Sequence, residues 1–257
     1  EVLDRLETFS KSHPEGWLIG NGWDQNDWPE KDFPDNQQLN EMFPGRPVIL
    51  SRIDGHAAIA NEKALEIAGV KAGEKISGGE VEVKDGKLTG ILIDNATSRV
   101  YSRVPEASKT QLSQALQAAQ NNCFAVGLTT VADCGLDYES ALFVDSLQKE
   151  NLLKMRMFIM LSDRKKNYEF LFKNGKINTG KVHVCGFKLF ADGALGSRGA
   201  CLLQPYSDKP GWSGFLLSSP EHFDAIAKLI SEHGFQMSTH AIGDSANRMM
   251  LKIYAKY

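Results

Sequence analysis

The chain has 257 residues, of which 42% are hydrophobic and 24% are charged, a composition typical of a folded α/β protein with a sizeable core. A formal net charge of −3 argues against a nucleic-acid or anionic-membrane partner, and no apolar run approaches the length of a membrane span. The four cysteines form no CxxC pair, which argues against a zinc–thiolate site and favours buried thiols in a reducing compartment. The compartment itself stays open, with the cytoplasm favoured.

The first 105 residues predict a small α+β part. A helix is expected over residues 2–12, followed by an ordered but irregular loop over 17–36 that is rich in Trp, Asp, Asn, Gly and Pro. Val48–Ser51 predicts a strand, and a helix is expected after the next turn, up to about Ala68. Alternating apolar residues on both sides of Asp85-Gly86 predict a hairpin with a type I′ turn.

From Ser108 onward, predicted helices and strands alternate, which favours a parallel sheet. Such a sheet belongs either to a doubly wound fold or to part of a (β/α)₈ barrel. Neither a Rossmann fingerprint nor a P-loop is present, which argues against nucleotide binding. The expected strands of this part cover residues 128–135, 153–161, 181–193 and 235–244.

Polar side chains lie at the ends of these predicted strands. Asp133, Lys188 and His240 follow or end three of them, and His56 follows the earlier strand at Val48–Ser51. In a barrel, catalytic groups project from the carboxyl ends of the strands. The sequence therefore indicates a site at this end of the sheet.

Lys188 is the most unusual of these residues, because an unpaired ammonium inside a barrel is costly. A depressed pKa would make it a nucleophile or base, a neighbouring carboxylate would neutralise it, and carbamylation would make it an anionic ligand able to bridge two metal ions. A plainer alternative is that Lys188 reaches solvent at the strand end. His240, on the next predicted strand, is a natural metal ligand.

Four segments, DGHAAIANEKALEIAGV, GLTTVAD, FKLFADGALGSRGA and THAIGD, resemble the YtcJ-like branch of the metal-dependent amidohydrolase superfamily. The resemblance implies an α/β fold, with a partial TIM-like (β/α)₈ barrel comprising about strands 2–5 and a smaller α+β insert. It implies a leading helix over residues 1–16, an insert with the hairpin over 17–105, and the partial barrel over 106–257.

The resemblance also implies site residues. Lys188 falls at the position of a carboxylated lysine that bridges metal ions, zinc being favoured, and His240 falls at a metal-binding histidine. His56, Asp192, Arg198 and Trp23 are candidates for substrate binding. Plainer roles compete for each: a loop or cap for His56, an Asx-turn for Asp192, an ion pair for Arg198 and the core of the insert for Trp23.

The chain departs from the family pattern in one respect: it contains no His-x-His motif. We expect an internal fragment that lacks the first and the last barrel strands, with the general base beyond Tyr257. The parent would hydrolyse carbon–nitrogen bonds of a small amide or cyclic amide, and this chain alone would be inactive. Lys188 would then be a free amine, with Asp133 or Asp192 as its charge partner.

Two further functions stay open. The chain could be a non-catalytic (β/α) domain that binds a small amide-like molecule, or Lys188 could form a Schiff base with a carbonyl compound. Unpaired strand edges of a partial barrel also predict a homodimer or higher oligomer, since exposed edges favour pairing with another chain.

Overall fold

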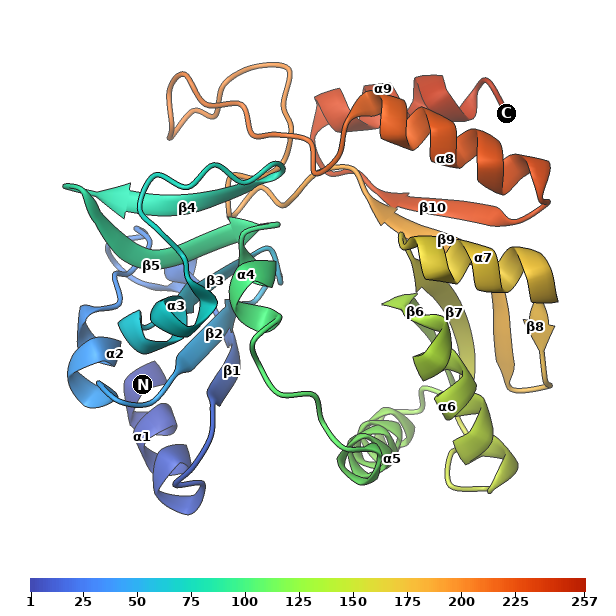
Figure 1. Cartoon of the computed structure of the whole chain (residues 1–257), viewed down its shortest axis with the longest axis horizontal. Coiled ribbons are helices and arrows are strands. Elements are labelled where there is room, and N and C mark those ends of the chain that lie inside the picture. The colour runs from blue at the N-terminus through green and yellow to red at the C-terminus, as the bar shows by residue number, and fades with distance from the viewer. The chain divides into compact units, whose positions relative to one another are not determined.

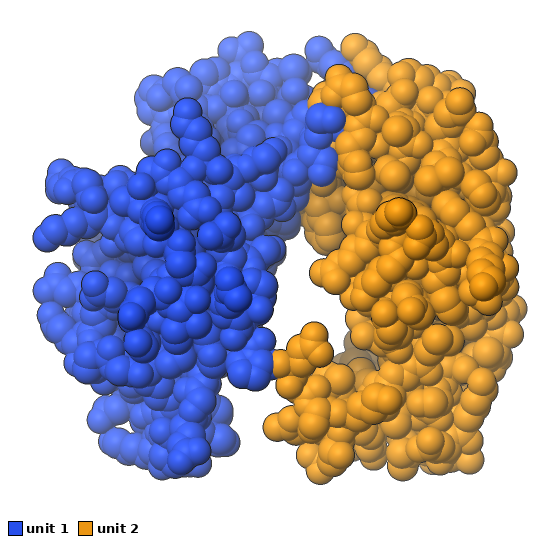
Figure 2. Space-filling view, viewed as in Figure 1, with its two compact units in different colours: residues 1–105, 191–219, 241–249 blue, residues 106–190, 220–240, 250–257 orange.

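The computed structural model describes residues 1–257 and divides the chain into two compact units, drawn in blue and orange in Figure 2. Unit 1 comprises Glu1–Pro105, Ala191–Ser219 and Ala241–Met249, and unit 2 comprises Glu106–Phe190, Pro220–His240 and Met250–Tyr257. The expected insert, residues 17–105, therefore lies in the same unit as two later segments of the chain.

Unit 1 is built on a five-stranded sheet with the order β1-β2-β3-β5-β4 (Figure 1). Strands β1 and β2 are parallel, and the other neighbours are antiparallel. Its elements are α1 (Val2–Ser12), β1 (Leu18–Trp23), the 3₁₀ helix η1 (Gln25–Asp27), α2 (Gln37–Met42), β2 (Val48–Arg52), β3 (Ala57–Ala60), α3 (Glu62–Ala68), β4 (Gly79–Lys84), β5 (Lys87–Asp94) and α4 (Thr97–Tyr101).

This sheet has apolar residues on both faces. Because strand side chains alternate, Leu50 and Ile59 face one hydrophobic cluster with Trp23, whereas Ile49 and Leu92 face a second cluster that includes residues of α3 and α4. The sheet is therefore covered on both sides, and its ends are left to carry polar groups.

The predicted hairpin is confirmed. Lys84 pairs with Lys87 across the two-residue turn, and Asp85 and Gly86 have φ angles of 51° and 77°. A type I′ turn needs positive φ at both central residues, which Asp and Gly tolerate.

Two predictions for unit 1 are wrong. Residues 18–23, expected in an irregular loop, form β1 because they pair in parallel with β2, and Gly20 allows the close approach of Leu50. Ala57–Ala60, expected in a helix, forms β3 between β2 and β5, where all four residues are buried. In both places, pairing with a distant strand overrides local propensity.

Unit 2 contains a parallel sheet with the order β10-β9-β7-β6, and the short β8 adds to β9 in antiparallel fashion. Its elements are α5 (Lys109–Ala125), β6 (Thr130–Leu136), α6 (Tyr138–Lys149), β7 (Arg156–Ser162), α7 (Lys165–Asn174), β8 (Ile177–Asn178), β9 (Val182–Phe190), α8 (Pro220–Glu232) and β10 (Gln236–His240). The last helix, α9 (Asp244–Tyr254), contributes residues to both units.

The α/β fold class with a parallel sheet is confirmed. The four parallel strands follow one another in chain order, as successive strands of a β/α barrel do, and they form an open sheet with edges at β6 and β10. Helix α5 begins with the expected Ser108 cap, whose hydroxyl accepts from the Gln111 amide in a capping box. None of the helices combines the length and apolar character that crossing a membrane requires.

Candidate functional site

Lys188 and His240 lie at the carboxyl ends of neighbouring parallel strands. In the β9–β10 register, Ser238 is opposite Lys188 and His240 is opposite Phe190. The Phe190 ring contacts both residues: the Lys188 ammonium lies 4.2 Å from its centroid, and the His240 ring centroid lies 5.4 Å away. Adjacent strands thus bring the two predicted metal ligands to one edge of the sheet.

Within unit 2, the Lys188 ammonium contacts the Phe190 ring and forms no ion pair with Asp133, so the expectation that Asp133 neutralises it is wrong. Asp133 is on β6, two strands away from β9. Asp192 belongs to unit 1, where its carboxylate accepts from backbone amides. Burial lowers the pKa of Lys188, and burial also raises the pKa of Asp133. The Phe190 ring, a weaker partner than a carboxylate, faces the ammonium.

The described residues do not complete a metal site. No group of three or more His, Cys, Asp or Glu side chains is arranged to hold an ion, and all four cysteines are free thiols. Lys188 and His240 are two candidate ligands, one of which would need carbamylation to bind a cation. A stable site needs more donors than these.

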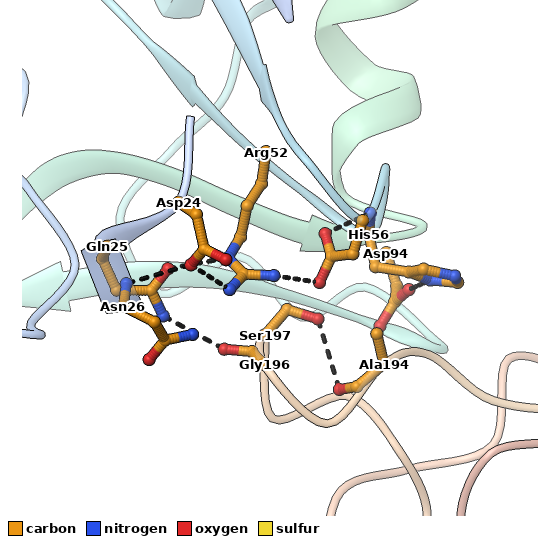
Figure 3. Close-up of polar contacts among 10 residues, drawn as sticks. Asp24, Gln25, Asn26, Arg52, His56, Asp94, Ala194, Gly196 and Ser197 are labelled. Atoms are coloured by element: carbon orange, nitrogen blue, oxygen red, sulfur yellow. Dashed lines mark hydrogen bonds and ion pairs between the residues drawn. The ribbon is translucent and has the colours of Figure 1, made fainter. Parts of the chain in front are cut away.

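A second polar cluster lies in unit 1 around Arg52, at the end of β2 (Figure 3). The Arg52 side chain is 3% exposed and forms ion pairs with Asp24 and Asp54, each at 2.5 Å. Its Nε donates to Gln25 Oε1 at 2.7 Å, and Gln25 Nε2 donates to the Gly196 carbonyl oxygen at 3.1 Å. Arg52 thereby ties η1, the turn after β2 and the loop after β9 together.

His56 and Asp94 form the other half of this cluster. His56 Nδ1 lies 2.6 Å from Asp94 Oδ1, and the Asp94 amide donates to the His56 carbonyl oxygen. The His56 side chain is 13% exposed, whereas that of Asp94 is 1% exposed. Burial lowers the pKa of His56, but the hydrogen bond and the negative charges of Asp94, Asp54 and Asp192 outweigh it, so that the pKa is raised.

The glycines of the segment DGALGSRG lie against these charged groups. A Cβ atom added at Gly193 or Gly199 would lie 2.2 or 2.1 Å from Asp94 Oδ2, and one added at Gly196 would lie 2.7 Å from an Arg52 nitrogen. Side chains at these positions would therefore collide with Asp94 and Arg52. The loop is glycine-rich because its backbone packs on the buried ends of β2 and β5.

Asp192 is fully buried and holds the backbone of three segments. Its carboxylate accepts from the amides of Cys201 at 2.7 Å, Ile242 at 2.9 Å and Gly243 at 2.8 Å. Direct substrate contact, expected for Asp192, does not fit these surroundings, because the carboxylate is enclosed and its oxygens are already bonded. The simple Asx-turn is also wrong, since two of its three donors are some fifty positions away in the chain.

Arg198 and Trp23 have mainly structural partners. Arg198 forms an ion pair with Asp208 at 3.0 Å, and its guanidinium lies 5.7 Å from the centre of the Phe33 ring. Trp23 is 5% exposed, donates from Nε1 to the Leu50 carbonyl oxygen and stacks on Trp28. Trp23 also lines two hollows of about 560 and 530 Å³ beside α1, so it belongs to the core and to a pocket wall.

Comparison with known proteins places this geometry in context. The amidohydrolase family signature matches residues 1–257. The chain belongs to the amidohydrolase family. It is 33% identical over 252 residues to YtcJ of Bacillus subtilis, a protein named as an amidohydrolase, and the match covers 94% of this chain and 46% of YtcJ.

Two other amidohydrolase-related matches are informative. An N-substituted formamide deformylase of Arthrobacter pascens is 31% identical over 148 residues, covering 55% of this chain and 27% of that protein. The crystal structure of a metal-dependent hydrolase from Pyrococcus horikoshii OT3 superposes with a TM-score of 0.67 at 26% identity, covering 94% of this chain and 48% of that one. The chain therefore spans about half the length of YtcJ and of this structure.

The sequence reasoning missed Asp24, Arg52 and Asp94. A signal was present, because Arg52 ends the buried strand β2 and Asp94 ends the buried strand β5, just as Lys188 and His240 lie near strand ends. A charged residue that ends an apolar strand is worth singling out in this family, whichever sheet the strand belongs to.

Proposed function

We propose that the whole protein to which this amidohydrolase chain corresponds is a metal-dependent hydrolase of carbon–nitrogen bonds in small amides or cyclic amides. The observation that carries the proposal is the placement of Lys188 and His240 at the ends of adjacent parallel strands in a member of this family. The names of the deformylase relative and of the structurally similar hydrolase support the reaction class.

Lys188, once carboxylated, and His240 would supply two of the ligands for a divalent cation, with zinc favoured. The described residues do not complete that ligand set, so the remaining ligands and the general base are assigned to parts of the protein outside residues 1–257. We expect this chain on its own to bind metal weakly and to be inactive. No catalytic step is derived from the two ligands alone.

His56 is the residue we assign to substrate contact, with Arg198 and Trp23 as further candidates. His56 retains some exposure and is held by Asp94, whereas the Arg198 guanidinium is 20% exposed and would have to share its charge with Asp208. Trp23 would contribute only as part of a pocket wall. We assign Asp192 a structural role, in which its carboxylate holds the backbone of the loop that carries Arg198.

We also propose a homodimer or higher oligomer, because β6 and β10 are the edges of an open parallel sheet. Light scattering at micromolar concentration tests this. A mass of twice 28.4 kDa or more supports it, and a monomer contradicts it.

A non-catalytic domain that binds small amide-like molecules is the second candidate function. The observation that favours it is the His56–Asp94 pair, which is formed within the chain and belongs to no group of three or more metal-binding side chains. Thermal shift measurements with amides in the presence of a chelator distinguish the two functions. Stabilisation without metal favours the binding domain, whereas no response favours the hydrolase.

A hydrolysis assay tests the main proposal. The full-length protein is loaded with zinc and incubated with N-formylated amines and cyclic amides, and the release of amine groups is measured. Activity that His240→Gln and Lys188→Met abolish, and that the exposed-residue control His13→Gln retains, supports the proposal. Release of no amine from any substrate of the panel contradicts it.

Borohydride trapping tests the Schiff-base alternative for Lys188, which the lowered pKa and the missing carboxylate partner keep open. Covalent capture of carbonyl compounds at Lys188 would favour that chemistry, and no capture would favour the metal-ligand role.

A further inference from the structure

The carboxylate of Asp94 is enclosed more completely than a surface ion pair requires. Its side chain is 1% exposed, and its Oδ2 atom is buried without a hydrogen-bond partner. The two glycine α-carbons of Gly193 and Gly199 pack against that oxygen, as the positions of their would-be Cβ atoms show. Burying a carboxylate with one unsatisfied oxygen costs folding free energy. The hydrogen bond between Asp94 Oδ1 and His56 Nδ1 offsets part of that cost.

The backbone at Asp94 points to the same conclusion. Asp94 has φ of 49°, a left-handed conformation that is uncommon outside glycine and that Asp and Asn tolerate best. It ends β5 at the point where its own amide bonds to the His56 carbonyl oxygen at 2.8 Å. Main chain and side chain of Asp94 thus fix His56 at two points.

We propose that Asp94 is a positioning residue that holds the His56 imidazole in the Nδ1–H tautomer and presents Nε2 as the ligand-facing nitrogen. In that arrangement the Nδ1–H donates to the carboxylate, as in other carboxylate–histidine pairs whose partner fixes tautomer and ring orientation. Nε2 then accepts a substrate N–H when the ring is neutral and donates to a substrate oxygen when the ring is protonated.

The loop Gly193–Gly199 also contributes to the positioning of His56 by Asp94. Because the loop backbone covers Asp94 Oδ2, any residue larger than glycine at position 199 would push the carboxylate away from His56. The loop therefore has a role in the orientation of His56 besides its role in the fold. The contact of His56 with substrate rests on the proposed function, whereas its positioning by Asp94 does not.

Nitrogen NMR of the histidine side chains tests the positioning in the intact 257-residue protein. Long-range ¹⁵N–¹H spectra identify the protonated ring nitrogen, and His56→Gln assigns the signal among the six histidines. We expect His56 to carry its proton on Nδ1 in the wild type. Asp94→Asn, which the left-handed backbone tolerates, moves the proton to Nε2 or produces a mixture. It also lowers the His56 pKa, because the hydrogen bond to a charged carboxylate and the Asp94 charge are lost.

Two control pairs separate positioning from general damage. Asp85→Asn, at the hairpin turn, leaves the His56 signals unchanged. Gly199→Ala perturbs them without any change of charge, whereas Gly45→Ala, which has no neighbour within 4 Å and no positive φ, does not. If Asp94→Asn fails to fold, the wild-type tautomer of His56 and the Gly199→Ala spectrum still test the positioning of His56 by Asp94.

A wild-type His56 with its proton on Nε2, or a tautomer that Asp94→Asn and Gly199→Ala leave unchanged, overturns the proposal. Kinetics of the zinc-loaded full-length protein give an independent readout: Asp94→Asn raises KM on the order of tenfold, with a smaller change in kcat, as expected for a lost binding contact. A wild type that hydrolyses nothing but shows the Nδ1–H tautomer contradicts the proposed function and leaves the positioning role in place.

Discussion

The charged residues at the strand ends of unit 1 and those of unit 2 have different environments. Arg52, Asp94 and Asp192 in unit 1 are almost fully enclosed and hydrogen-bonded to groups from several segments. Lys188 and His240 in unit 2 both contact the Phe190 ring, and no ion pair joins the Lys188 ammonium to a carboxylate of its own unit.

The comparison shows that the charged residues of unit 1 find their partners within the chain, whereas Lys188 forms no ion pair within its own unit. The unit 1 cluster supplies both Arg52 and its carboxylate partners, and it pairs His56 with Asp94, so most of its charged groups are bonded within the chain. The unit 2 pair belongs to no group of three or more metal-binding side chains, and under the proposed function its remaining partners are a cation and further ligands. The predictions below test this contrast.

Removal of Arg52 should have the largest effect on stability. Arg52→Met leaves Asp24 and Asp54 as unpaired, partly buried carboxylates, and we expect a loss of about 3–5 kcal/mol in the free energy of unfolding. Urea denaturation measures it. The control Arg5→Ala, which breaks an exposed ion pair with Glu1, should cost about 0.5 kcal/mol or less. Equal losses in the two variants would contradict a preorganised cluster.

Asp192→Ala should have the next largest effect. Three buried amides lose their acceptor, and at about 1–3 kcal/mol for each unsatisfied group we expect a loss of at least about 3 kcal/mol. Hydrogen exchange should show lost protection at Cys201, Ile242 and Gly243, with the amides of the Asp85 turn as an internal control. Unchanged protection at all three amides would show that the Asp192 carboxylate is not what holds these segments.

Lys188→Met should have the smallest effect and the opposite sign. Since burial holds the folded-state pKa of Lys188 below its usual value, the ammonium destabilises the fold at neutral pH. The variant should be slightly more stable at pH 7, and its advantage should shrink as pH rises through the lowered pKa of the wild-type lysine. Urea midpoints from pH 7 to 10.5 measure this. A variant less stable at every pH would mean that Lys188 has a stabilising partner within the chain.

Much of unit 2 could be predicted from the sequence, and much of unit 1 could not. The capping box at Ser108 and the alternation after it are local signals, as is the turn at Asp85-Gly86. Strands β1 and β3 depend on pairing with β2, and no local pattern specifies such pairing.

The same reason separates the site residues. Lys188 stands out because it is a single charged residue in the apolar run GFKLFA, and His240 stands out because it ends a short predicted strand. The Arg52 and Asp94 clusters join residues that are 28, 38 and more than 100 positions apart, so only the folded chain brings Asp24, His56 and the DGALGSRG loop to them.

Metal content tests the central claim most directly. Zinc bound per protein is measured by mass spectrometry of metals in the full-length protein, for the wild type, His240→Gln, Lys188→Met and the control His13→Gln. The account predicts at least one zinc ion in the wild type and in His13→Gln, and a large loss in the other two variants. Equal zinc content in all four proteins, or no zinc in the wild type, would contradict the assignment of Lys188 and His240 as metal ligands.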